Sequence, residues 1–109
     1  SLGKTGLSLN MVISKAKKRI RCEVYITNEW KEAAFRALEG QKDAIEKEVG
    51  HPLCWMPLPD KQSARIALDH ELDPYPPENR QHVCEWFAHT MPVMYAAFKD
   101  RVGQLQKPD

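Results

Sequence analysis

Three side chains of types that bind metal ions lie close together in the last third of the chain: His82, Glu85 and His89. On a helix, positions i, i+3 and i+7 share one side, and imidazole and carboxylate groups are ligands that zinc accepts. Two histidines seven residues apart lie about 10 Å apart along a helix axis, which is too far to share one metal ion unaided. We therefore expect a solvated polar face here and no metal site.

A second candidate is the one basic cluster of the chain, which lies between residues 15 and 21. Tyr25 should share a sheet face with its arginines, and a face with cations and aromatic rings can hold single-stranded nucleic acid. The alternative is a charged edge and loop that keep the sheet from pairing with other chains. The candidate nucleic-acid contacts are Lys15, Lys17, Lys18, Arg19, Arg21 and Arg65.

No catalytic arrangement is recognisable from local pattern. The acidic residues fall mostly on expected helix surfaces or in the loop 69–73, and no Ser/His/Asp or Cys/His set is apparent. Cys22, Cys54 and Cys84 form no CxxC pair, so we interpret them as small buried residues in a reducing compartment. We expect a cytoplasmic protein that is not an enzyme and binds no cofactor.

Length and charge limit the possibilities further. The 109 residues suffice for one domain, and the net charge of +1 means that any nucleic-acid role must depend on a local patch. No apolar run approaches the ~20 residues that span a bilayer, so we expect no membrane role. The chain begins at Ser1 rather than Met, so we expect a single domain, 1–109, excised from a larger protein.

The strictest alternation of apolar and polar residues, over Arg19–Ile26, predicts a central half-buried strand. Residues 7–13 also alternate and predict a first strand, joined to the second by a short polar link at residues 14–18. Two strands joined by so short a link form an antiparallel hairpin. The basic cluster therefore lies at a hairpin tip and on the outer face of the strand that follows.

The remaining elements repeat this order. A single helix over residues 30–49 is predicted to end at Gly50, and strands over residues 53–56 and 63–68 form a second hairpin. A second helix starts near Pro77 and ends at Gly103, with a kink or a break into two helices expected at Pro92. Its inner stripe is Val83, Phe87, Met91, Met94, Phe98 and Val102.

The predicted fold is therefore an α+β two-layer sandwich of order ββαββα. A mostly antiparallel four-stranded sheet has two helices on one face. The strand order stays open.

Four segments carry a family resemblance over essentially the whole chain. They are Gly3-Lys4-Thr5-Gly6, Arg21-Cys22-Glu23-Val24-Tyr25-Ile26, Gly50-His51-Pro52-Leu53-Cys54-Trp55 and Glu85-Trp86-Phe87-Ala88-His89-Thr90-Met91. With these segments, the chain resembles the bacterial domain-of-unknown-function family found C-terminal to PD-(D/E)XK nuclease-like domains. The resemblance implies an accessory domain of a nuclease-like or defence-associated protein, and it brings no catalytic residues. The nuclease motif itself is absent, because no Pro-Asp followed by an acidic-x-Lys signature lies on an expected strand, and Pro59-Asp60 falls in a turn.

Three functions follow as hypotheses. The first is a non-catalytic accessory module whose basic cluster contacts nucleic acid and whose partners are DNA or a nuclease-like domain of the same protein. Phosphate contacts of this kind position a ligand and do not read its sequence. The second is a protein-interaction or dimerisation domain without nucleic-acid binding, which would use the uncovered sheet face, with Trp55 and Met56 if these two side chains point outward. The third is a small-molecule enzyme, which would need a convergent polar pocket that local patterns do not reveal.

Overall fold

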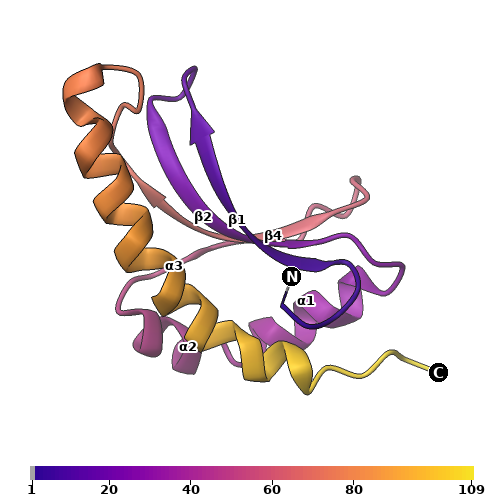
Figure 1. The fold of residues 1–109 in the computed structure, drawn as a ribbon. Coiled ribbons are helices and arrows are strands. Elements are labelled where there is room, and N and C mark those ends of the chain that lie inside the picture. Colours follow the sequence, from indigo (N-terminus) through magenta and orange to yellow (C-terminus); the bar gives the residue numbers. More distant parts are fainter. Residues whose placement is uncertain (1) are drawn as a thin grey trace.

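A computed structural model describes residues 2–109 and shows one antiparallel sheet with helices on one side (Figure 1). In the first half of the chain, two consecutive helices follow the first two strands, where one helix was expected. In the second half, a short 3₁₀ helix precedes the last helix. The elements are β1 (Leu7–Ser14), β2 (Arg19–Ile26), α1 (Lys31–Glu39), α2 (Lys42–Val49), β3 (Cys54–Met56), β4 (Ala64–His70), η1 (Pro77–Asn79) and α3 (Arg80–Gly103).

The sheet has the order β1-β2-β4-β3, and every neighbouring pair is antiparallel. The expected four-stranded antiparallel sheet is thus confirmed, and both predicted hairpins are present. β2 and β4 fill the centre, while β1 and β3 are the edges. β3 is only three residues long and lies between Pro52 and Pro57, so it offers few backbone groups for further pairing.

Alternation along β2 places its apolar side chains against the helices. Cys22, Val24 and Ile26 are fully buried there. They belong to the main core with Phe35 of α1 and Phe98 of α3. Burying each large apolar side chain contributes about 1.5–3 kcal/mol, and this explains why the layer of helices stays on this face.

The prediction of a single helix over residues 30–49 was wrong, because the chain forms α1 and α2 with a break between them. Gly40 ends α1, and the backbone N–H of Gln41 donates to the Leu38 carbonyl at 2.9 Å. This bond spans three residues, as at a tightened helix end. Glycine disfavours a helix interior by about 1 kcal/mol, so the break at this position costs little.

Helix α3 is longer than any other element, and Pro92 lies inside it without breaking it into two. Figure 1 shows that its axis changes direction partway along, so the expected bend replaces the expected break. Most of the predicted inner stripe is buried. Met91 is only half-buried, and its Sδ accepts a hydrogen bond from the Cys22 thiol, with the two sulfur atoms 2.9 Å apart. No helix in residues 2–109 is both long and apolar enough to cross a membrane.

The cysteines differ from the prediction that all three are buried. Only Cys22 is buried, whereas Cys54 and Cys84 are exposed. Cys54 lies on the outer face of an edge strand, and Cys84 follows the inward-facing Val83 on α3 and so faces solvent. Burial, together with the charge of Glu23, raises the pKa of the Cys22 thiol to about 12, which makes it a poor nucleophile.

Candidate nucleic-acid interface and adjoining pocket

The tip of the β1–β2 hairpin carries Lys15, Lys17 and Lys18, and all three are exposed. The turn is held by two backbone donors. The N–H of Lys17 donates to Ser14 Oγ at 3.1 Å, and the N–H of Lys18 donates to the Lys15 carbonyl at 3.3 Å. Throughout the described chain, no carboxylate lies within ion-pair distance of these lysines. Their charges are therefore available to a ligand.

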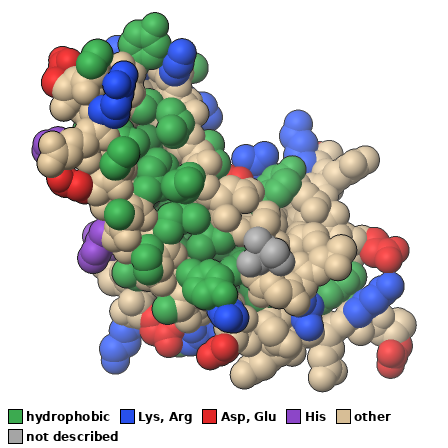
Figure 2. All heavy atoms as spheres, in the orientation of Figure 1, with side chains coloured by type: hydrophobic (Ala, Val, Ile, Leu, Met, Phe, Trp, Pro, Cys, Tyr) green, Lys and Arg blue, Asp and Glu red, His purple; other side chains and the backbone are tan. Residues whose placement is uncertain are grey.

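An aromatic ring lies beside the tip. The ammonium of Lys15 is 4.7 Å from the centroid of the Tyr75 ring, and Tyr75 is 67% exposed. Tyr75 precedes η1, so the segment before α3 meets the hairpin tip at one end of the molecule, where Figure 2 shows several basic side chains together. Exposed lysines next to an open aromatic face are suited to phosphates and to a stacked base.

The arginines that follow the tip are held by a carboxylate of the neighbouring strand. Arg21 lies opposite Asp69 in the β2–β4 register and makes two bonds to it, Nε to Oδ1 at 2.5 Å and Nη2 to Oδ2 at 3.1 Å. Arg19 Nη1 lies 3.5 Å from the same carboxylate. Arg21 is only 9% exposed, so its guanidinium is paired within the fold and is largely inaccessible to a ligand.

Arg65 is also on this outer sheet face, as predicted, and it too has a partner. Its Nη1 lies 3.3 Å from Oε1 of Glu23, and its guanidinium lies 4.8 Å from the centroid of Tyr25. Glu23 is 3% exposed and also lies 3.6 Å from Arg21. The outer face is therefore a packed network of paired charges and offers little free positive charge.

The pKa of Asp69 reflects this network. Burial alone would raise the pKa of the carboxyl, but the hydrogen bond and charge of Arg21, with the charge of Arg19, outweigh it and hold the pKa below the ordinary value. The hydrogen bond to Asp69 raises the pKa of Arg21 in turn, against the effect of burial. Both groups stay charged at neutral pH.

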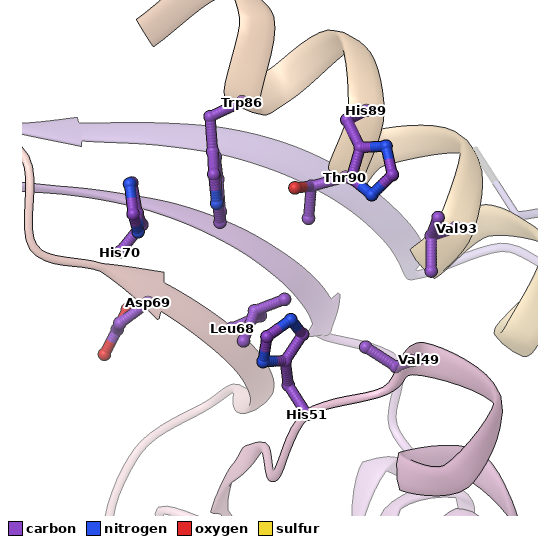
Figure 3. A pocket seen from close by; sticks show the side chains of 9 residues that line it. All are labelled: Val49, His51, Leu68, Asp69, His70, Trp86, His89, Thr90 and Val93. Atoms are coloured by element: carbon purple, nitrogen blue, oxygen red, sulfur yellow. The ribbon is translucent and has the colours of Figure 1, made fainter. Parts of the chain in front are cut away.

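A pocket of about 190 Å³ lies between α3, β4 and the segment after α2 (Figure 3). His70 stacks on one face of Trp86, with ring centroids 5.3 Å apart and planes 5° from parallel. The other face of Trp86 is directed toward the cavity, with Thr90 beside it. The lining residues are Val49, His51, Leu68, Asp69, His70, Trp86, His89, Thr90 and Val93.

The pocket has room for a group of the size of one ring, since a dry cavity of about 150 Å³ in another protein takes up benzene. His51 and His89 line it from different segments and can donate or accept hydrogen bonds there. In the part of the chain that the structure describes, no three His, Cys, Asp or Glu side chains are placed to hold a metal ion. His82 and Glu85 are exposed on α3.

Sequence reasoning identified the tip lysines but missed this pocket. His51, His70 and His89 come from three separate segments, and only the packing of α3 on the sheet brings them to one cavity. The stack of His70 on Trp86 was equally hidden, because the two residues lie on different elements. A local signal for either feature is absent from the sequence.

Comparison with known proteins gives one family. A family model described as "Domain of unknown function (DUF4268)" matches residues 1–102, so the chain belongs to this family. No curated protein and no solved structure matches the chain. The expected membership of a family of unknown function is confirmed, and the association with nuclease-like domains stays a prediction.

Proposed function

We propose that this DUF4268 domain is a non-catalytic accessory module that contacts nucleic acid through the hairpin tip. One observation carries the proposal: Lys15, Lys17 and Lys18 are exposed, have no carboxylate partner, and adjoin the open ring of Tyr75. Lysine neutralises phosphates, and an aromatic face stacks an unpaired base without regard to its identity. The ligand expected from this combination is single-stranded nucleic acid.

The arginines have a smaller part in this proposal than in the sequence-based hypothesis. Arg19 adjoins the tip and is partly exposed, so it can add to the positive field. Arg21 and Arg65 are held by Asp69 and Glu23, and they would have to leave these partners in order to bind phosphate. We therefore assign the contact to the tip lysines and keep the outer sheet face as scaffold.

The accessory role itself comes from the family resemblance. We propose that the tip helps a nuclease-like or defence-associated domain of the same bacterial, cytoplasmic protein to engage nucleic acid. The contacts would position the ligand and leave sequence readout to other parts. The tip stands at one extremity of the domain, so a strand bound there can extend toward a neighbouring domain (Figure 1).

The test is binding of a single-stranded oligonucleotide across a salt series, by fluorescence anisotropy. Each lysine that neutralises a phosphate should contribute about −0.7 to the slope of log K against log salt. Lys17→Glu/Lys18→Glu should weaken binding and reduce the slope by about 1.4. The matched control, Lys42→Glu/Lys47→Glu, changes the same number of exposed charges on α2 and should bind as the unchanged protein does.

Two results would contradict the proposal. One is no binding by the unchanged protein even at low salt. The other is equal loss of affinity in both double variants, because this would report net charge and not a site. Tyr75→Ala separates stacking from charge, since it should weaken binding while leaving the salt slope intact.

A further inference from the structure

The edge strand β1 lacks the usual protection of sheet edges. It runs for eight residues, Leu7–Ser14, and contains no charged residue and no proline. Soluble proteins commonly protect such edges with lysine, proline, bulges or short length. The opposite edge is protected in this way, because β3 has three residues and a proline on each side. The two edges of this sheet therefore differ in their capacity to pair.

The direction of the backbone groups of β1 follows from its hydrogen bonds. Thr27 N–H donates to the Gly6 carbonyl at 2.8 Å, so Gly6 faces β2, whereas Leu7 bonds with Lys4 and Leu2. Hydrogen-bonding groups alternate in direction along an antiparallel strand.

The odd-numbered residues therefore face away from β2. Leu9, Met11 and Ile13 direct their N–H and C=O groups out of the sheet, and within residues 2–109 these groups have no hydrogen-bond partner.

The side chains of the same residues are also uncovered. Met11 is 60% exposed and Ile13 is 58% exposed, although both lie on the face that the helices cover elsewhere. Figure 2 shows hydrophobic side chains in a continuous stretch between the hairpin and α3. Free backbone groups and free apolar side chains thus coincide at one edge, and this is the chemistry that an added β-strand satisfies.

We propose that a second copy of this chain pairs with β1 in antiparallel orientation, about a two-fold axis at Met11. Leu9 then lies opposite Ile13 of the second copy, and Met11 lies opposite Met11. In each of these pairs, the two residues form two backbone hydrogen bonds with each other, one from each N–H to the other residue's C=O. The apolar side chains then meet on one face of a continuous eight-stranded sheet. Cross-strand contacts between apolar side chains stabilise the pairing of the two strands.

Charge favours a second copy in this orientation. On the other face of β1, Asn10 and Val12 meet across the axis and no like charges oppose one another. The antiparallel arrangement places the two lysine-bearing tips at opposite ends of the pair, whereas a parallel arrangement would bring them together. Pairing about Met11 also leaves Leu7, whose backbone already bonds with Lys4, outside the new ladder.

The experiment is sedimentation equilibrium of the whole chain with charge-swap variants at the axis. The unchanged chain should be a dimer. Met11→Lys and Met11→Glu should each weaken dimerisation about tenfold or more, since each places like charges opposite one another. An equimolar mixture of the two variants should restore the dimer. Ala44→Lys, which adds a charge on the exposed side of α2 and away from β1, should leave dimerisation unchanged.

The mixture separates a lost interface from a lost fold, because misfolded variants would not rescue one another. A chain that stays monomeric up to about 0.5 mM would overturn the proposal and leave this edge to a strand from another protein. A dimer that both single variants leave intact, or one that their mixture fails to restore, would place the interface elsewhere and overturn it too.

Discussion

Replacing Asp69 with asparagine should destabilise the fold, because the buried guanidinium of Arg21 depends on this carboxylate. The side chains of Arg21 and Asp69 are 11% and 21% exposed, and they share two hydrogen bonds. Removing one partner of a fully buried pair costs about 3–5 kcal/mol. Because Asp69 retains some solvent and Glu23 still lies 3.6 Å from Arg21, we expect about 2–3 kcal/mol.

The assay is urea unfolding at neutral pH, followed by far-UV circular dichroism. A loss of this size lowers the midpoint of thermal unfolding by about 10–20 °C in a domain of this length. The matched control is Glu39→Gln, which removes a carboxylate from an exposed pair with Arg36, whose side chains are 37% and 54% exposed. That change should cost less than about 0.5 kcal/mol.

The same pair predicts a dependence on pH. The pKa of Asp69 is lower in the folded state than in the unfolded chain. The stability that the ionised Asp69 contributes is therefore present in full above the pKa of the unfolded chain, about 3.9. It is lost as the pH falls through the lower pKa of the folded state. The difference in stability between the unchanged protein and Asp69→Asn should be constant above about pH 5 and shrink below about pH 4.

Two observations would refute this reasoning. The first is a loss for Asp69→Asn no larger than that for Glu39→Gln. The second is a difference in stability that stays constant from pH 7 to pH 3, because the paired state of Asp69 would then contribute nothing.

Three further predictions follow from single contacts. Iodoacetamide at pH 8 should label the two exposed cysteines of the folded protein and reach Cys22 only after unfolding, as mass spectrometry would show. Glu46→Ala should cost about 1–2 kcal/mol in urea unfolding, because Glu46 Oε2 accepts from the Trp55 indole at 3.0 Å and from a backbone N–H at 2.7 Å. Gly6→Ala should lower the thermal midpoint, since an added Cβ would lie 2.7 Å from Asn28 Cβ at a backbone φ of +82°. Unaltered midpoints, or labelling of Cys22 in the folded state, would contradict them.

Local patterns predicted the elements better than their partners. The bounds of β2 follow from strict alternation over Arg19–Ile26, and the structure has the same bounds. The break at Gly40 was missed, because apolar spacing continues across it and a single glycine is often tolerated in a helix. Alternation placed Arg21 on the outer face, but it could not show that Asp69 lies opposite, since this depends on the register of two strands far apart in sequence.

The candidate site divides in the same way. The tip lysines were predictable because one turn contains them all, and their exposure follows from the hairpin. The pairing of the arginines with carboxylates depends on which strand lies next to β2, and the sequence did not determine the strand order. The pocket beside Trp86 depends on how α3 packs against β4 and the segment after α2. Features formed by non-local packing leave no local pattern to detect.

The short edge strand β3 has a consequence for assembly. A sheet with two open edges can add chains without end, which is the route to fibres. Here one edge has three residues bounded by Pro52 and Pro57, and proline has no N–H to donate to a further strand. The proposed pairing through β1 would use the open edge of each copy and leave only the protected edges outward. Growth of the sheet would then stop at a closed pair, and raising the protein concentration should yield dimers without yielding aggregates.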